Sequence, residues 1–305
     1  MYNNYTQPLG KLIVSLVILY HLYADDGQLM RFFDPRKLHQ DKIAADHLEH
    51  CINEIAMWMF NNKLRLNQDK TEFLILSNSA NRRRISVNKL NLNDGVIDST
   101  PSVRNLGVHM DSSLSLEIHI GYIQKTCYFY LNWIRRIRIY LTKDTAKSLV
   151  HALVIARIDY CNSIYVNLPK STTNRLQRIM RCAARVVALP RYGESVTTVC
   201  KELHWLPIAE RAQFKVLCLV YKSIHGSSPG YLSELITPYV PNRELRSGSS
   251  HLLCVRKCRI KYGERAFSHA GPTLWNTLPL DIRITRSIQI FKRKLKTFLF
   301  RKAYC

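Results

Sequence analysis

Two adjacent carboxylates, Asp25 and Asp26, are the side chains of this sequence best suited to metal-dependent chemistry. They follow a β-branched and aromatic run over residues 12–24, and a shorter apolar stretch follows at 29–33. This pattern predicts a strand, an acidic tight turn and a second strand. Because neighbouring carboxylates repel each other, a divalent cation such as Mg²⁺ would stabilise the pair and could serve phosphoryl transfer there. A solvated turn without a metal is the alternative that these two residues leave open.

Charge is distributed unevenly along the chain. The sequence has 45 Lys and Arg against 22 Asp and Glu, a formal net charge of +23. Residues 1–100 hold 12 basic against 11 acidic side chains, whereas residues 101–305 hold 33 against 11. Such a basic second part indicates a polyanionic partner, and nucleic acid is favoured because each neutralised phosphate releases a counterion. An acidic protein or an anionic membrane surface would also be attracted.

Composition and cysteine usage indicate a folded protein of a reducing compartment. Hydrophobic residues make up 47% of the 305 residues, enough for a core, and the length suggests two domains. The nine cysteines are scattered singly and show no disulfide framework. The apolar run from Leu12 to Tyr20 is nine residues long, too short to cross a bilayer, and is predicted to be a buried strand.

Four residues in the last quarter of the chain could be zinc ligands: His251, Cys254, Cys258 and His269. Three residues separate the two cysteines, and His269 lies eleven residues beyond Cys258. Zinc sites usually have closer pairs, and the apolar alternation of this segment fits a strand equally well. We therefore favour the strand.

The period of the apolar residues predicts an α+β arrangement for residues 1–110 and mainly helices after Asp111. In the first part, helical spacing indicates a helix between residues 35 and 61. Strands are expected at 73–76, 85–90 and 103–110, with a turn at Asn93-Asp94-Gly95. In the second part, one helical stripe consists of Ile120, Ile123, Cys127, Tyr130, Ile134, Ile137 and Leu141. Further helices are expected from about Thr142, Ser171, Pro207 and Ser287.

Arginines lie mostly off these apolar stripes. Four of them fall between positions 175 and 185 with no acidic residue among them. We predict a nucleic-acid-binding surface formed by Arg135, Arg136, Arg138, Arg175, Arg178, Arg181 and Arg185. A merely solvated helix face is the alternative.

The segment Tyr20-His21-Leu22-Tyr23-Ala24-Asp25-Asp26-Gly27-Gln28-Leu29 resembles the catalytic hairpin of reverse transcriptases from jockey-like non-LTR retrotransposons. Other blocks resemble the same family in the same order. They are Pro8-Leu9-Gly10, Trp58-Met59, Leu64-Arg65-Leu66-Asn67-Gln68-Asp69-Lys70-Thr71-Glu72, Val103-Arg104-Asn105-Leu106-Gly107-Val108, Asp159-Tyr160-Cys161-Asn162, Ala183-Ala184-Arg185, Leu203-His204-Trp205-Leu206-Pro207, Leu274-Trp275-Asn276-Thr277-Leu278-Pro279 and Phe291-Lys292-Arg293-Lys294-Leu295-Lys296.

The resemblance implies an α+β fold in which a partial reverse-transcriptase palm precedes a mainly helical, thumb-like region. The corresponding parts are 1–110, 111–230 and a basic C-terminal region, 231–305. The implied activity is RNA-directed DNA polymerisation with Mg²⁺, and the implied partners are an RNA template and a DNA primer. The family also implies a place in the nucleus and cytoplasm, and no membrane is expected.

Roles for individual residues follow from the same resemblance. Asp25 would be the main metal ligand and Asp26 its weaker companion. Tyr23 would lie near the primer end or the incoming nucleotide, and Lys70 near the triphosphate, where it could help to protonate the leaving pyrophosphate. From the residues alone, Tyr23 could equally be a core aromatic and Lys70 a solvated charge at a helix end.

Three further residues would shape the backbone that holds the primer: Leu106, Gly107 and Val108. The helices from about 115 to 190 would track the template–primer duplex, in agreement with the basic charge counted independently of the resemblance.

The sequence also departs from the family. Gly27 stands where Thr is usual, and Met30 where an aromatic is usual. The family's first palm strand, with another metal-binding aspartate, its fingers and its endonuclease domain are expected upstream of Met1. We therefore expect no polymerisation by this chain alone. A non-catalytic nucleic-acid-binding protein is the alternative, and a relic without function is a third possibility.

Overall fold

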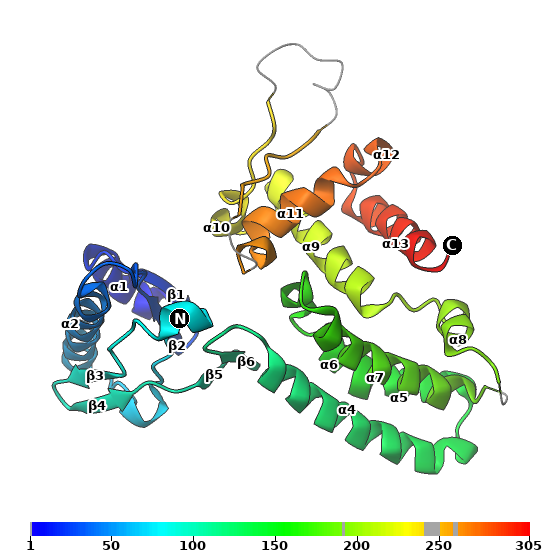
Figure 1. Cartoon of the computed structure of the whole chain (residues 1–305), viewed down its shortest axis with the longest axis horizontal. Helices are drawn as coiled ribbons and strands as arrows, with labels where there is room; N and C mark the ends of the chain where they lie inside the picture. The colour runs from blue at the N-terminus through cyan, green and yellow to red at the C-terminus, as the bar shows by residue number, and fades with distance from the viewer. Residues whose placement is uncertain (1, 191–192, 241–250, 259–261) are drawn as a thin grey trace. The chain divides into compact units, whose positions relative to one another are not determined.

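The computed structural model describes residues 2–190, 193–240, 251–258 and 262–305 of the chain. They form two compact units, unit 1 (Met1–His119) and unit 2 (Ile120–Cys305) (Figure 1). Unit 1 combines helices with short antiparallel hairpins, and unit 2 is mainly helical. The predicted α+β class is therefore confirmed, while the division at residues 110 and 230 stays a prediction.

Unit 1 is built on two helices, α1 (Tyr2–Ser15) and α2 (Gln40–Asn61). Their apolar faces meet in a small core that consists of Leu9, Ile13, Ile18, Cys51 and Ile55. The helix predicted between 35 and 61 is confirmed. The strand predicted over residues 12–24 is wrong in its first part, which is helical. The reason is that apolar residues recur there every three or four positions, so a helix buries them on α2.

Three separate hairpins complete unit 1. They are β1 (Leu19–Tyr23) with β2 (Asp26–Met30), β3 (Lys89–Leu92) with β4 (Gly95–Asp98), and β5 (Ser102–Asn105) with β6 (Val108–Asp111). The predicted turn at Asn93-Asp94-Gly95 joins β3 to β4. The strand predicted at 73–76 is wrong, since only Phe73 forms a bridge, to Ser99. A 3-10 helix, η1 (Gln68–Lys70), and a short helix, α3 (Ser79–Arg82), lie between α2 and β3.

Asp111 organises the turn that leads from β6 into the first long helix of the helical part. Its side chain is buried and accepts hydrogen bonds from Ser113 N at 3.1 Å, Ser113 Oγ at 2.6 Å, Ser115 N at 2.9 Å, Ser115 Oγ at 3.1 Å and Leu116 N at 2.7 Å. Burial raises the pKa of this carboxyl, but the hydrogen bonds outweigh that effect and leave the pKa below its ordinary value.

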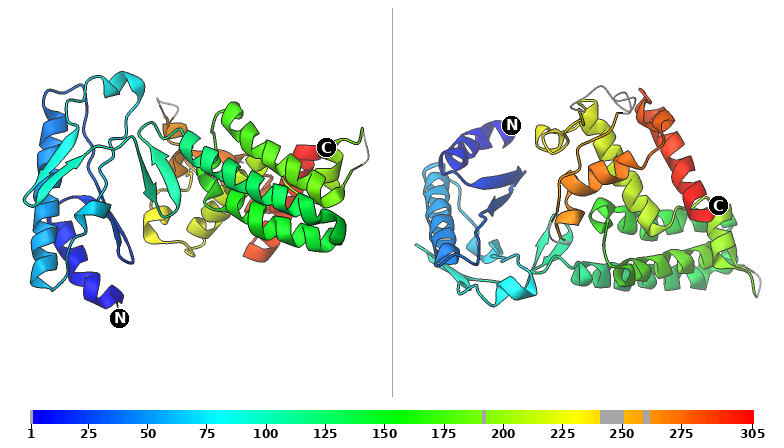
Figure 2. Two further views of the ribbon diagram at one scale, coloured as in Figure 1. Left: turned by 90° about the horizontal axis from the view of Figure 1, so that it is seen from below. Right: turned by 45° about the horizontal axis from the view of Figure 1, so that its top comes forward.

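Fourteen helical elements follow β6 in the described part of the chain. They are α4 (Glu117–Ile137), η2 (Arg138–Tyr140), α5 (Lys143–Val150), the π-helical turn η3 (His151–Ile155), α6 (Ala156–Asp159), η4 (Asn162–Tyr165), α7 (Lys170–Ala188), α8 (Val196–Glu202), α9 (Ile208–Ile224), α10 (Gly230–Ser233), α11 (Phe267–Asn276), α12 (Leu280–Arg283) and α13 (Ile288–Tyr304); η5 (Gly263–Arg265) is a further 3-10 turn. Helices α4, α5 and α7 run side by side (Figure 2). No described helix is long and apolar enough to cross a membrane.

Helix α9 is the centre of unit 2, because α7, α11 and α13 all pack on it. Tyr221 of α9 stacks on Phe291 of α13 with ring centroids 4.3 Å apart, and its hydroxyl donates to the Thr285 carbonyl at 2.9 Å. Gly271 lets α11 approach closely, since a Cβ there would lie 2.9 Å from Val220 Cγ2. The basic helix α13 is thus fixed by an apolar and aromatic contact.

Replacing Asp111 should destabilise the fold in a pH-dependent way. We expect Asp111→Ala to lower the free energy of unfolding by about 2–3 kcal/mol, because the N–H groups of three residues lose a buried acceptor. Since the folded-state pKa is lowered, this contribution is complete above the ordinary value of 3.8 and is lost as pH falls through the lowered pKa. Urea unfolding between neutral and acidic pH measures it. Asp94→Ala, in an exposed turn, is the matched control, and an equal loss there would contradict the assignment.

Candidate functional site

The β1–β2 hairpin presents Asp25 and Asp26 to solvent. Tyr23 pairs with Asp26, so Ala24 and Asp25 form a two-residue turn. Ala24 has φ 52°, a left-handed conformation that costs a non-glycine residue some strain and fixes a tight reversal. Both carboxylates are exposed, with Asp25 in the turn and Asp26 at the start of β2. The strand–turn–strand arrangement predicted around the pair is present, although β1 begins only at Leu19.

Carboxylate oxygens are the ligands that Mg²⁺ prefers, and one or two carboxylates together with water and phosphates are a common set for it. The hairpin supplies two such groups. Within the described residues, however, no group of three or more His, Cys, Asp or Glu side chains is placed to hold a metal ion. The pair therefore fits one part of a Mg²⁺ site and is not a complete protein-built site. His251, Cys254, Cys258 and His269 are likewise not placed to hold a metal ion together. The thiol of Cys254 instead donates a hydrogen bond to the Pro238 carbonyl at 3.5 Å.

The other two side chains expected at the reaction centre are also exposed. Tyr23 is 67% exposed at the end of β1, which excludes the core-aromatic interpretation. Lys70 ends η1, where the Asn67 side chain caps its backbone N–H. Both belong to unit 1.

Leu106 and Gly107 form the turn of the β5–β6 hairpin. Asn105 pairs with Val108, and the two turn residues have φ 43° and 82°. Positive φ at both central positions is the type I′ geometry of two-residue hairpins, which the right-handed twist of paired strands favours. The single strand predicted over 103–110 is therefore wrong: the chain reverses in its middle and exposes Leu106.

Five of the seven arginines predicted to face nucleic acid are exposed in unit 2. Arg135 and Arg136 lie near the end of α4, and Arg178, Arg181 and Arg185 lie on α7. The opposite face of α7 is buried, so these three arginines are held outward by the packing of the helix. Arg175 is half-buried, and its Nε donates to Gln124 Oε1 of α4 at 2.7 Å.

Arg138 is the one predicted nucleic-acid-binding residue that the structure removes from the surface. It is buried, and its guanidinium donates to the carbonyls of Val186 and Val187 at 2.8 Å each and of Leu141 at 2.7 Å. Val186 and Val187 belong to the last turn of α7, whose carbonyls have no partner within the helix. The cation therefore caps the C-terminus of α7 and interacts favourably with the helix dipole, and its burial keeps it away from a phosphate backbone.

Helix α13 adds a basic surface that the predicted set omits. Its exposed cations are Lys292, Arg293, Lys294, Lys296, Arg301 and Lys302, and no acidic residue lies between Ser287 and the last residue. Lys294 also pairs with Asp281 at 3.6 Å. The sequence did contain a signal for this surface, because Phe291, Leu295 and Leu299 recur every four residues. These three side chains are buried, and the basic residues therefore lie on the exposed side of the helix.

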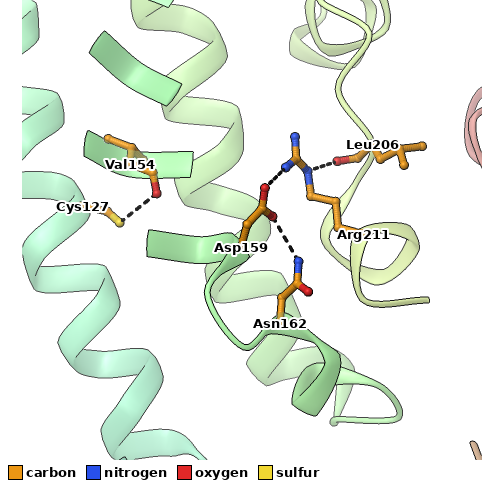
Figure 3. A network of polar contacts seen from close by, with 6 residues as sticks. All are labelled: Cys127, Val154, Asp159, Asn162, Leu206 and Arg211. Carbon is orange, nitrogen blue, oxygen red and sulfur yellow. Dashed lines mark hydrogen bonds and ion pairs between the residues drawn. The ribbon is translucent and has the colours of Figure 1, made fainter. Parts of the chain in front are cut away.

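Asp159 and Asn162 of the block Asp159-Tyr160-Cys161-Asn162 belong to a hydrogen-bond network that connects helices (Figure 3). Arg211 donates through Nη1 to Asp159 Oδ2 at 2.6 Å and through Nε to the Leu206 carbonyl at 2.8 Å. Asn162 Nδ2 donates to Asp159 Oδ1 at 3.1 Å. Asp159 thereby ties the end of α6 to the start of α9. The arrangement joins elements and contains no nucleophile set against a general base.

The π-helical turn η3 lies beside this network. Its Val154 carbonyl accepts a hydrogen bond from the Cys127 thiol of α4 at 3.9 Å (Figure 3). Burial raises the pKa of the Cys127 thiol to about 11, so this group is a packed, neutral donor.

Scans against protein-family models, curated proteins and solved structures find no match for this chain.

We predict that Arg138 stabilises the fold and does not contact nucleic acid. We expect Arg138→Met to lower the free energy of unfolding by about 3 kcal/mol, because two buried carbonyls and one half-buried carbonyl lose a charged donor. Chemical denaturation measures the change. Arg135→Met, three residues earlier and exposed, is the matched control and should stay within about 0.5 kcal/mol. Similar stability of the two variants would show that Arg138 does not cap α7.

The ion pair of Arg211 and Asp159 should be energetically coupled. A double-mutant cycle with Arg211→Ala and Asp159→Ala is expected to give about 1–2 kcal/mol of coupling, because the Arg211 side chain is only 14% exposed. The exposed pair of Lys294 and Asp281 is the control, for which about 0.5 kcal/mol or less is expected. Equal coupling in both cycles would contradict the proposed role of the pair.

Proposed function

We propose that this chain is a nucleic-acid-binding protein of the non-LTR retrotransposon reverse-transcriptase type. In this proposal unit 2 holds the polyanion, and the β1–β2 hairpin contributes Asp25 and Asp26 to a Mg²⁺ site. The observation that carries the proposal is the separation of charge. Unit 1 has 13 basic and 13 acidic residues, whereas unit 2 has 32 basic against nine acidic residues. Nine carboxylates cannot neutralise 32 cations, so unit 2 retains a strong positive field.

Nucleic acid fits this field better than a bilayer does. A helix that lies on a membrane inserts its apolar face below the headgroups. On α7 and α13 those faces are already used, since Leu176, Ile179, Phe291 and Leu295 are fully buried within the unit. The two helices therefore offer cations without an insertable apolar stripe, which suits a phosphate backbone.

The carboxylate pair supports a reverse-transcriptase origin but not independent polymerisation. When bound, Mg²⁺ would activate an attacking hydroxyl and stabilise the leaving pyrophosphate. Asp25 and Asp26 would hold it, and Lys70 would attract the phosphates. Among the described strands, β1 pairs only with β2. An added strand that brings a further carboxylate, as the family resemblance implies, would complete the site. By itself the chain is proposed not to extend a primer.

Binding should depend on salt and on α7, and not on the carboxylates. The full chain is expected to bind labelled DNA or RNA, with affinity falling steeply between about 50 and 200 mM salt in fluorescence anisotropy. Arg178→Gln/Arg185→Gln should reduce the slope of log affinity against log salt by about two, since each contact contributes about one. Arg83→Gln/Arg84→Gln, an exposed pair in the neutral unit 1, is the matched control. Asp25→Ala should leave binding unchanged.

Two results would overturn the proposal. Salt-independent binding, or equal effects of the two arginine pairs, would remove unit 2 as the binding surface. Primer extension with Mg²⁺ by the purified chain, lost in Asp25→Ala, would show that two carboxylates suffice for polymerisation.

A further inference from the structure

The outer side of α4 and η2 carries an exposed row of aromatic and basic side chains. We call it the stacking face, and it consists of Tyr122, Lys125, Phe129, Trp133, Arg136 and Tyr140. Successive members are three or four residues apart, so they lie on one side of the helix. The row spans about 27 Å at 1.5 Å per residue.

The four aromatic rings of this row are exposed, while the opposite side of α4 is buried in unit 2. Tyr122, Phe129, Trp133 and Tyr140 are 50%, 55%, 61% and 82% exposed. Ile120, Ile123, Cys127 and Leu131 supply the contact with the rest of unit 2 instead. Large apolar side chains that gather at the surface beside polar ones are typical of an interaction site.

The rings of Phe129 and Trp133 are neighbours, with centroids 6.0 Å apart and planes inclined by 40°. Tyr130 meets the Phe129 ring edge to face, with centroids 5.4 Å apart, and Arg157 lies over the Tyr130 ring at 5.1 Å. The stacking face therefore offers adjacent aromatic surfaces that are not taken up by that cation. Flat, apolar ligands with their own π-systems fit such surfaces.

Basic side chains alternate with the aromatic side chains along the stacking face. Lys125 lies between Tyr122 and Phe129 in the row, and Arg136 lies between Trp133 and Tyr140. No acidic residue occurs between Glu117 and Asp144. The ligand must consequently present flat apolar groups and negative charges in alternation.

We propose that the stacking face binds single-stranded nucleic acid, with bases on the rings and phosphates on Lys125 and Arg136. This inference rests on the proposed function and names the form of nucleic acid and its surface. Unpaired bases stack on aromatic side chains while a positive groove follows the backbone. In a duplex the bases are already stacked on one another, so the rings would gain nothing from it.

Other occupants fit the face less well. Burial in lipid would place Lys125 and Arg136 among hydrocarbon. A second copy of the same face would bring like charges together without an acidic partner.

Intrinsic fluorescence gives a direct readout of the stacking. The sequence has four tryptophans, of which Trp205 and Trp275 are buried, Trp58 is half-buried and Trp133 is exposed. An oligothymidylate of about twenty nucleotides should quench the emission of the full chain through Trp133. A duplex of equal length should quench it far less at equal saturation.

Substitution then separates stacking from charge. Phe129→Ala/Trp133→Ala should weaken binding of the single strand about ten- to a hundredfold in anisotropy and leave duplex affinity within about threefold. Phe129→Tyr/Trp133→Phe should retain most of the affinity. Phe32→Ala/Phe60→Ala, two exposed rings of unit 1, is the matched control and should change neither.

Each contrary outcome overturns the inference in a recognisable way. If Phe129→Ala/Trp133→Ala lowers the affinity for single strand and duplex equally, or lowers neither, the rings do not stack on bases. The unaltered chain would still bind nucleic acid, so the proposed function would stand. Dissociation of a dimer, or loss of binding to phosphatidylserine vesicles alone, in the alanine variant would assign the face to a second copy or to a membrane. If the unaltered chain binds neither form of nucleic acid, the proposed function fails together with the inference.

Discussion

Unit 2 must hold a large excess of like charge on a small helical body, and this constraint shapes its structure. With 32 basic and nine acidic residues, mutual repulsion has to be outweighed by apolar burial. Helices α7, α11 and α13 accordingly meet around α9 through aliphatic and aromatic side chains, and most cations of α7 and α13 are exposed. Two of the enclosed guanidinium groups of unit 2 are matched by acceptors: Arg138 donates to backbone carbonyls, and Arg211 donates to Asp159 and a carbonyl.

Unit 1 follows a different principle, since its charges balance. Its stability rests on a small core between α1 and α2, and its hairpins are joined by side chains that accept backbone N–H groups. Asp41 of α2 accepts from Ser86 and Val87, and Glu49 accepts from Asn91 N. Burial raises the pKa of Asp41, yet these hydrogen bonds lower it to about 2. Asp25 and Asp26, by contrast, stand exposed at a hairpin turn, where carboxylates are open to an ion or a ligand.

The proposals for the two units are complementary in chemistry. A phosphate backbone needs cations in an extended array, which α7 and α13 provide, and unpaired bases need aromatic planes, which α4 provides. Metal-assisted phosphoryl transfer needs carboxylates, which the β1–β2 hairpin provides only in part. In these proposals, nucleic-acid binding uses side chains that unit 2 supplies, whereas catalysis requires a further carboxylate beside the hairpin.

The sequence alone determined the distribution of charge and part of the local structure. Periodic apolar residues correctly predicted α2 and α4, and the Asp25–Asp26 turn was predicted from the run that precedes it. Tertiary contacts decided the rest. Residues 12–15 became helical because α2 offers a surface for their apolar face. The segment 103–110 reversed at Leu106 and Gly107, although its composition suits a continuous strand. Arg138 and Arg136 are two residues apart on one basic helix end, yet only the position of the α7 C-terminus decides which guanidinium is buried and which meets solvent.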